Sequence, residues 1–149
     1  MELENLNSRS ALFFGALPQE WQQSIVPFWE NIQENATIYA VVEDDKILVG
    51  GIVFTENLPQ MTDFERSHAA HFFSKGYLYI GFLWVDPDRR NEKLGSKWLQ
   101  LLKVLCQDKP FWLTIEEMEL RKFYERNGFV MIAESPDPAN PEWLCVYEP

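Results

Sequence analysis

Cysteine is scarce in this sequence: only Cys106 and Cys145 occur among its 149 residues, and their spacing is not that of metal ligands. The chain is 46% hydrophobic and 15% aromatic, so its length suits one domain, residues 1–149, whose core needs no disulfide. We therefore expect both cysteines to be core thiols in a cytoplasmic protein, and we expect no metal site.

Long apolar runs are missing as well. No run approaches the ~20 apolar residues that a membrane-spanning helix needs. The stretch from Ala11 to Leu17 is too short for the apolar region and cleavage site of a signal peptide, and Glu2 and Glu4 follow Met1 where such a peptide has basic residues. These features predict no membrane association and no secretion signal.

Positive charge is also in short supply. The 13 Lys and Arg residues face 23 Asp and Glu residues, which gives a net charge of −10 and a sequence pI near 4.6. Residues 1–65 are especially acidic, because they oppose eleven acids with only Arg9 and Lys46, a net charge of −9. Such a chain repels phosphate backbones and anionic membranes, so we expect no nucleic-acid partner.

Residues 89–103 form a local exception to this acidity. Five basic residues there face only Glu92, which gives the segment a net charge of +4. A cationic segment in an acidic protein favours a small anionic ligand, whereas a solvated helix face is the ordinary explanation of a charge run. Only the surrounding chain pattern can decide between the two.

The first third of the chain has the patterns of helices followed by a hairpin. Apolar residues from Pro18 to Asn35 have helical spacing, and Pro27 is expected to produce a kink or two short helices. The stretches Thr37–Glu43 and Ile47–Thr55 are rich in strand-forming residues and predict an antiparallel hairpin. Its adjacent glycines, Gly50 and Gly51, are expected to mark a bulge.

Later patterns predict an alternation of strands and helices. Residues 56–76 predict a short helix or a lid-like insertion, because apolar residues and His68 recur there at helical spacing. The elements expected next are a strand buried on both faces from Tyr77 to Val85, a helix from Leu94 to Leu105, a strand from Phe111 to Ile115, a helix from Glu117 to Asn127, and strands from Phe129 to Ala133 and from Trp143 to Tyr147.

The strand, helix and strand between Tyr77 and Ile115 predict a parallel, right-handed connection. The helix then begins at the carboxyl end of the first strand, where unpaired backbone N–H groups and a partial positive charge suit a phosphate or pyrophosphate. In the turn from Arg90 to Ser96, Gly95 is expected to let a ligand approach the backbone, and Ser96 offers a hydroxyl. An ordinary capped helix is the alternative for this turn taken alone.

Two motifs stand in this context at a defined separation. The first is Val85-Asp86-Pro87-Asp88-Arg89-Arg90-Asn91-Glu92-Lys93-Leu94-Gly95-Ser96, and the second is Phe123-Tyr124-Glu125-Arg126-Asn127-Gly128-Phe129. Together they resemble the GNAT acetyltransferase superfamily. In that family a strand ending in Val-x-Pro leads into Arg/Gln-x-x-Gly-x-Gly/Ala at the acetyl-CoA pyrophosphate, and a later Phe-Tyr-x-x-x-Gly-Phe closes the core. The order and spacing match from Tyr77 to Phe129.

The resemblance implies an α/β (α+β) GNAT acyl-CoA N-acyltransferase fold, with a mixed central sheet and helices on both faces, and acetyl-CoA as co-substrate. It implies that backbone N–H groups of the strand around Leu83 to Val85 face the thioester carbonyl. The cofactor-binding residues that it implies are Leu83, Trp84, Val85, Arg89, Arg90, Asn91, Glu92, Lys93, Leu94, Gly95 and Ser96.

The sequence departs from the family pattern at two positions. Lys93 stands at the first glycine of the motif, where its side chain can restrict approach to the backbone or add its own charge to the pyrophosphate site. Glu117 stands where many relatives place an asparagine, so the usual side-chain contact to the cofactor is not assigned.

The resemblance also implies a catalytic role for Tyr124. Acetyl transfer to an amine requires a neutral amine, a polarised thioester carbonyl and protonation of the departing thiolate. A phenol with the ordinary pKa near ~10 is protonated at neutral pH, so Tyr124 is expected to act as the general acid. The alternative is that Phe123 and Tyr124 only share core packing.

The general base is left open. No acidic residue lies between Tyr77 and Val85, where several relatives have a glutamate, so the amine proton can leave through water. Residue type alone makes candidates of His68, His71, Glu116 and Glu117.

We therefore expect an acetyl-CoA-dependent N-acetyltransferase that acts on the primary amine of a small molecule or peptide. The acidic residues 1–65 favour a cationic acceptor, and the 56–76 insertion is expected to shape acceptor choice. A non-catalytic CoA-binding regulatory module and an acidic protein-interaction domain without a cofactor are the alternatives. Whether the chain forms a homodimer is left open.

Overall fold

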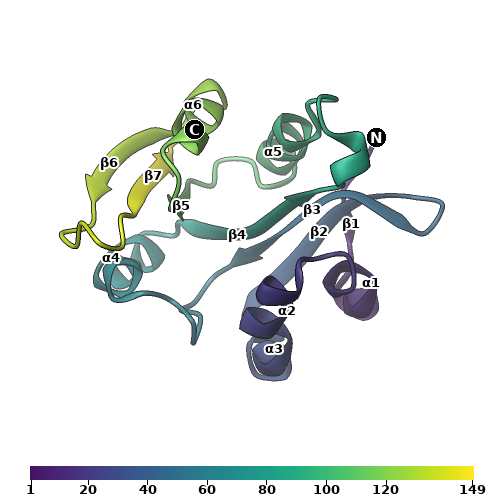
Figure 1. Cartoon of the computed structure of the whole chain (residues 1–149), viewed down its shortest axis with the longest axis horizontal. Helices are drawn as coiled ribbons and strands as arrows, with labels where there is room; N and C mark the ends of the chain where they lie inside the picture. The colour runs from purple at the N-terminus through teal and green to yellow at the C-terminus, as the bar shows by residue number, and fades with distance from the viewer.

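The computed structural model describes all residues from Met1 to Pro149 and contains a seven-stranded sheet in the order β1-β2-β3-β4-β5-β7-β6 (Figure 1). Adjacent strands are antiparallel except β4 and β5, which are parallel, as the strand-helix-strand pattern predicts. The strands are β1 (Glu4–Asn5), β2 (Ala36–Glu43), β3 (Lys46–Phe54), β4 (Leu78–Val85), β5 (Phe111–Ile115), β6 (Val130–Glu134) and β7 (Trp143–Tyr147).

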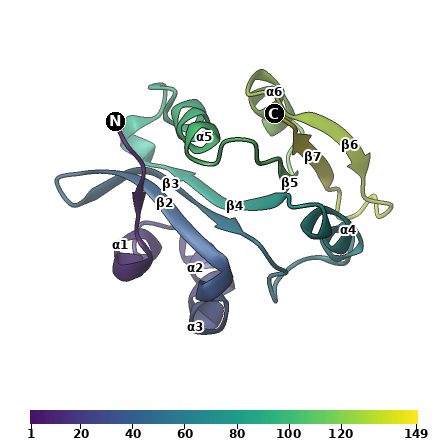
Figure 2. The ribbon, with the colours of Figure 1, turned by 180° about the vertical axis from the view of Figure 1, so that it is seen from behind.

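Helices cover both faces of this mixed sheet, which confirms the expected fold class. They are α1 (Ser10–Phe14), α2 (Gln19–Ile25), α3 (Trp29–Ile32), α4 (Asp63–Ser74), α5 (Leu94–Leu105) and α6 (Glu119–Arg126). Figures 1 and 2 show α1 to α4 on one face and α5 and α6 on the other, with β1 at the sheet edge beside β2. No helix in the structure has both the length and the apolar character that crossing a membrane requires.

Two adjacent glycines of β3 allow aromatic rings to pack closely on opposite faces of the sheet. A Cβ atom on Gly50 would lie 2.6 Å from a ring carbon of Phe13, and one on Gly51 would lie 2.8 Å from a ring carbon of Trp98. Both rings are fully buried, and each belongs to a different hydrophobic core. The pairing of β3 with β4 shifts register between Gly50 and Ile52, but the extra residue belongs to β4, so the two glycines lie opposite a bulge rather than in one.

The N-terminal helical region is interrupted where the sequence predicts. α2 ends at Ile25, a short 3-10 turn from Val26 to Phe28 contains Pro27, and α3 begins at Trp29. Proline has no N–H to donate and its ring clashes with the preceding turn, which explains the break. The break places Trp21 on one short helix and the buried Trp29 on the next.

The 56–76 segment contains a capped helix that packs onto the sheet. The Thr62 hydroxyl accepts a hydrogen bond from the Glu65 N–H, and the Glu65 carboxylate accepts one from the Thr62 N–H. The predicted helix is confirmed, but its buried face is formed by Glu65, Ala69 and Phe72, while Phe64 and His68 are only half-buried. Phe72 stacks on the buried Trp112 of β5 with ring centroids 5.2 Å apart.

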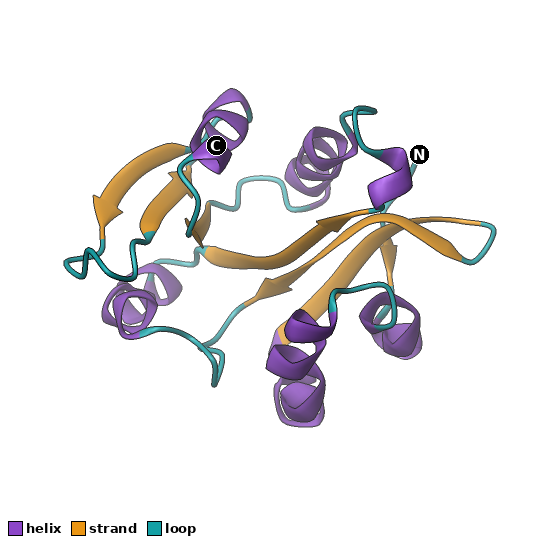
Figure 3. Cartoon of the chain, viewed as in Figure 1, coloured by secondary structure: helices purple, strands orange, loops and turns teal.

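Two expectations about burial are wrong. The strand Tyr77–Val85 is not buried on both faces, because only Tyr79 and Ile80 are buried and the residues from Gly81 to Val85 are half-exposed. The reason is that β4 pairs with β5 only at Leu78 and Tyr79. Figure 3 shows the strands after β4 turned away from those before it. Similarly, Cys145 is buried, but Cys106 lies partly exposed at the end of α5.

Candidate active site

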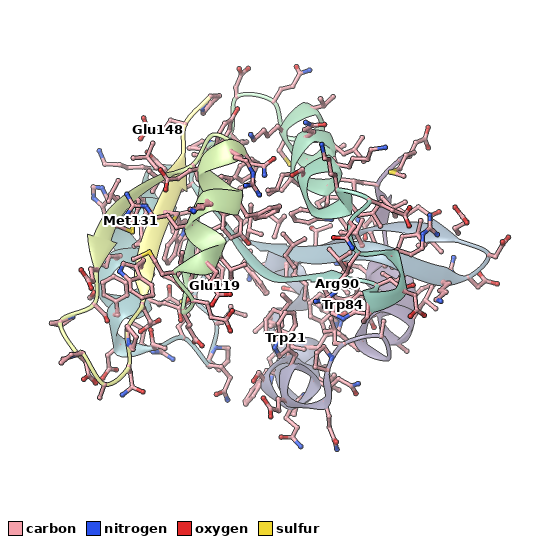
Figure 4. All side chains as sticks on the ribbon, turned by 45° about the horizontal axis from the view of Figure 1, so that its top comes forward. Trp21, Trp84, Arg90, Glu119, Met131 and Glu148 are labelled. Carbon is pink, nitrogen blue, oxygen red and sulfur yellow. The ribbon has the colours of Figure 1, made fainter.

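The divergence of β4 and β5 opens a cavity of about 640 Å³. Its walls come from β4, β5, α2, α6 and the segment that leads into α4. Tyr124 of α6 and Arg90 of the turn before α5 both line it, as does Trp21 of α2. In Figure 4, Trp21 and Arg90 lie across from α6, whose first residue is Glu119. The cavity therefore brings together the two motifs that the sequence singles out.

A bulge in β4 shapes the wall of this cavity. Gly81 and Trp84 are opposed by Ile52 and Gly50 of β3, so β4 has one extra residue in this interval. Phe82 accommodates it with φ of 57°, a left-handed conformation that costs a bulky residue about 1–2 kcal/mol. The Phe82 ring packs on Trp21 with ring centroids 6.1 Å apart, which holds this conformation in place.

The edge of β4 that faces β5 is open beyond Tyr79, because no strand pairs with it there. Gly81, Phe82 and Leu83 line the cavity at this edge, so polar groups of their backbone can face a ligand. Of the residues expected near the thioester carbonyl, Leu83 lines the cavity. Trp84 and Val85 do not line the cavity, and Val85 lies instead beside Gly95 of α5.

The first turn of α5 has free backbone donors. No side chain caps this 12-residue helix, and its first internal hydrogen bond runs from the Lys97 N–H to the Lys93 carbonyl at 3.1 Å. The N–H groups of Leu94, Gly95 and Ser96 consequently have no partner in the chain. Three free amides at the positive end of a helix dipole can bind an anion, so the Arg90–Ser96 turn has the backbone donors that the prediction of a pyrophosphate site requires.

The basic residues of this turn differ in whether their charge is compensated. Arg89 forms two hydrogen bonds to Glu92, at 2.7 and 2.9 Å, and lies 3.8 Å from Glu43. The Arg89 hydrogen bond lowers the pKa of Glu92, and the same contact raises the pKa of Arg89. Arg90 and Lys93 are exposed and form no ion pair. Their positive charges are therefore available to an anionic ligand.

Gly95 and Ser96 connect α5 to α6. A Cβ atom on Gly95 would lie 3.0 Å from Cζ of Phe123, so the space that glycine leaves is filled by this ring rather than by a ligand. The expectation that Gly95 clears a path for the ligand is therefore wrong on this side, although its N–H remains free. The Ser96 hydroxyl accepts a hydrogen bond from Asn127 Nδ2 at 3.1 Å. These contacts fix the helix that carries Tyr124 relative to the Arg90–Ser96 turn.

The conformation of Lys93 explains why a glycine is favoured at its position. Lys93 has φ of 58° and ψ of 31°, in the left-handed region. We expect Lys93→Gly to stabilise the protein by roughly 0.5–1 kcal/mol, because the ~1–2 kcal/mol of left-handed strain exceeds the added entropy of the unfolded chain. Urea unfolding of this variant tests the effect, with Lys93→Ala as the control that keeps the strain. A loss of stability in Lys93→Gly would contradict it.

Tyr124 lines the cavity from a packed position. The residue is only 8% exposed, and its ring lies between Phe123 and Phe129, with centroids 4.9 and 5.4 Å away. Burial raises the pKa of the Tyr124 hydroxyl well above its ordinary value, so this group stays protonated at neutral pH. No hydrogen bond within the chain engages this hydroxyl, so it is free to donate to a ligand. The packing of Tyr124 against Phe123 and Phe129 therefore leaves its hydroxyl without a partner in the chain.

The four candidate bases divide into two groups. Glu116 and Glu117 line the cavity from the loop after β5 and are exposed. His68 and His71 do not line it: His71 is exposed, and the His68 ring packs against Phe64 with centroids 5.0 Å apart. The structure therefore places only the two glutamates near the candidate site.

Sequence reasoning missed Glu65, which lines the cavity although it is only 7% exposed. Its carboxylate accepts hydrogen bonds from the Thr62 N–H at 3.0 Å, from the Thr114 hydroxyl at 2.8 Å and from the Tyr79 hydroxyl. The pattern Thr62-x-x-Glu65 is visible in the sequence, but it is that of a helix cap. One feature of the sequence does indicate a role besides capping, because Glu65 lies on the same helix face as the apolar residues Ala69 and Phe72.

The comparison with protein families agrees with this geometry. Residues 3–129 match the family described as Acetyltransferase (GNAT) family. The chain therefore belongs to the GNAT family of acetyltransferases, and acetyl-CoA is its co-substrate. The comparison with curated proteins finds no match. The structure brings together no group of three or more His, Cys, Asp or Glu side chains that could hold a metal ion.

Solved structures share the fold at low sequence identity. An aminoglycoside 6'-acetyltransferase type Ii is 15% identical with a TM-score of 0.66, and the match covers 99% of this chain and 97% of that one. An aminoglycoside 6'-N-acetyltransferase complexed with coenzyme A is 13% identical with a TM-score of 0.66 and the same coverage. A Bacillus anthracis str. Ames protein, described as a streptothricin acetyltransferase in complex with acetyl coenzyme A, is 16% identical with a TM-score of 0.57, covering 76% of this chain and 62% of that one.

Proposed function

We propose that this protein is an N-acetyltransferase that moves the acetyl group of acetyl-CoA directly to the primary amine of a small molecule or peptide. The observation that carries the proposal is the shared cavity, because Arg90, residues at the open edge of β4 and Tyr124 all line it. Acetyl transfer from a CoA thioester uses three features: a cationic group that binds anions, a polar backbone edge and a proton donor.

The Arg90–Ser96 turn fits the pyrophosphate of acetyl-CoA. The free N–H groups of Leu94, Gly95 and Ser96 would bind its oxygens, and Arg90 and Lys93 would supply the opposite charge. The open edge of β4 at Gly81 to Leu83 would bind the amide-containing arm and orient the thioester carbonyl. Arg89 acts in this proposal by holding Glu92 and so fixing the turn.

Tyr124 is proposed as the proton donor. As the amine nitrogen forms its bond to the carbonyl carbon, the carbon–sulfur bond breaks and its electron pair goes to sulfur. Tyr124 then gives its hydroxyl proton to that sulfur, and the proton lost by the new amide nitrogen returns to Tyr124 directly or through water. A second proton, which the acceptor ammonium loses before it attacks, leaves to solvent. The raised pKa of Tyr124 keeps the donor form populated.

The acceptor is proposed to be cationic. Among the charged side chains that line the cavity, Glu65, Glu116 and Glu117 are acidic and only Arg90 is basic. The net charge of −9 over residues 1–65 adds a wider negative field, which raises the local concentration of protonated amines. Two of the similar structures are aminoglycoside acetyltransferases, which supports an amine as acceptor.

A panel of amines tests this proposal, with release of free CoA as the readout. Cationic amines such as tyramine and spermidine should react faster than glutamate, an amine that carries net negative charge. The preference should weaken as ionic strength rises from about 0.01 to about 0.1 M, because the Debye length falls from ~30 to ~10 Å. Preferential use of glutamate, or rates for tyramine that do not fall with added salt, would contradict the electrostatic part alone.

A further inference from the structure

We propose that the buried Glu65 carboxylate binds the ammonium group of the acceptor, and that the acceptor carries this group on an apolar or aromatic body. The proposal rests on the proposed function and adds to it the residue that recognises the acceptor and the class of molecule that fits. No cationic side chain of the protein pairs with the Glu65 carboxylate.

Glu65 is a buried acid without a cationic partner. None of the ion pairs in the structure includes it, and all three of its hydrogen-bond donors are neutral groups. A buried carboxylate is costly unless an opposite charge compensates it. Because Glu65 lines the cavity, that charge can come from a ligand. Its two oxygens offer about four acceptor sites, of which three are filled, so one remains for an ammonium N–H.

The three donors hold the carboxylate in a defined place. Thr62 precedes α4, Tyr79 belongs to β4 and Thr114 belongs to β5. Tyr79 is also the last residue of β4 that pairs with β5, so Glu65 lies at the closed end of the gap between the two strands. An ammonium bound there would enter the same cavity that Leu83 and Tyr124 line, where the thioester is proposed to lie.

The wall on the side of α2 and the segment before α4 is mostly apolar, with Ser24 and Gln60 as its polar residues. Trp21, Leu58, Met61 and Phe82 line the cavity on the side of α2 and the segment before α4. Leu58 and Met61 are buried, and the Trp21 and Phe82 rings pack edge to face. Such a wall favours the hydrocarbon or aromatic part of an amine, and Glu65 would repel an acceptor carboxylate. A primary ammonium on an apolar body is the chemistry that matches both features.

A nearby acid provides a matched comparison for Glu65. Glu142 is 6% exposed, and its carboxylate accepts a hydrogen bond from the Thr62 hydroxyl at 2.9 Å. It therefore belongs to the same buried polar network, but it does not line the cavity. A role of Glu65 that is only structural would be shared by Glu142, whereas binding of the acceptor would not.

Glu65→Gln, measured with tyramine as acceptor, tests the proposal. Glutamine keeps an oxygen for the Thr62 N–H and removes the charge. The KM for tyramine should rise about 10- to 150-fold, the equivalent of a hydrogen bond to a charged group of 1.5–3 kcal/mol. The kcat and the KM for acetyl-CoA should change by less than about threefold, and Glu142→Gln should leave all three constants near wild type. An unchanged tyramine KM in folded Glu65→Gln, or equal effects in both variants, would overturn the proposal.

A measurement on the wild-type chain keeps the test independent of folding and of turnover. With CoA at saturation, N,N-dimethylphenethylamine and 2-phenylethanol are titrated by calorimetry. The first is a cation that forms no stable amide, and the second is a neutral analogue. The cation should bind at least about 10-fold more tightly, and equal affinities would overturn the proposal. Because neither ligand is acetylated, a chain that binds the cation but transfers no acetyl group would contradict the proposed function and leave this inference standing.

Discussion

Replacing Tyr124 by phenylalanine is expected to lower the rate of acetyl transfer by roughly 10- to 10⁴-fold, the range for loss of a positioned proton donor. Tyr124 lines the cavity, and the substitution removes only its hydroxyl, which has no hydrogen bond inside the chain, so the packing against Phe123 and Phe129 stays. Single-turnover rates and acetyl-CoA affinity should be measured together. The affinity should change little, since the interaction is made as the thiolate leaves.

Tyr147→Phe is a suitable control, because Tyr147 is a half-buried tyrosine of β7 that does not line the cavity. The pH dependence gives a second check. Burial raises the pKa of Tyr124, so the donor stays protonated from pH 7 to pH 10 and the wild-type single-turnover rate should not fall over this range. An unchanged rate in Tyr124→Phe, in a step shown to be limited by chemistry, would refute the role.

The second large effect is expected for Ser96→Asp at the start of α5. Ser96 is the third residue of the helix, and its N–H is one of the three free amides. An aspartate in the first turn should stabilise the helix by about 0.3–1 kcal/mol, and Asn127 can still donate to it. The same negative charge beside the pyrophosphate would weaken acetyl-CoA binding. Two negative charges about 4 Å apart at an intermediate dielectric repel by about 3 kcal/mol, which corresponds to a ~100-fold loss of affinity.

Ser96→Asp should therefore raise the stability of the protein and lower its affinity for acetyl-CoA. Damage to the fold would lower both. Thermal unfolding and calorimetric titration with acetyl-CoA measure the two quantities. Gln100→Glu is the matched control, because it makes the same change in charge at an exposed position one turn further along α5. Wild-type affinity in Ser96→Asp, or an equal loss in Gln100→Glu, would show that the pyrophosphate binds elsewhere. Gly95→Asp is a poorer choice, since its side chain would collide with Phe123.

Features that depend on local sequence could be predicted. The break at Pro27 and the parallel connection through α5 each follow from the chemistry of a few neighbouring residues. The free amides before Lys97 were predictable for the same reason, because a helix always leaves its first N–H groups unpaired.

Features that depend on contacts between distant segments could not be predicted. The charge of Arg89 is compensated by its ion pair with Glu92, and the space beside Gly95 is taken by Phe123 from the last helix. Glu65 is the clearest case, since Tyr79 and Thr114 reach it from two strands that diverge at that point. The spacing Thr62-x-x-Glu65 predicts the helix cap, but it does not predict that Glu65 also lines a cavity.

Transfer of a ¹³C-labelled acetyl group is the measurement that tests the central claim most directly. The full chain is mixed with acetyl-CoA labelled at the carbonyl carbon and with tyramine, and the label is followed by NMR. A direct N-acetyltransferase predicts that the thioester signal is replaced one for one by an amide carbonyl signal of N-acetyltyramine, with release of CoA and no lasting label on the protein. Tight binding of acetyl-CoA with the thioester signal unchanged, for tyramine and for every other amine of the panel, would contradict the account and identify the chain as a CoA-binding module.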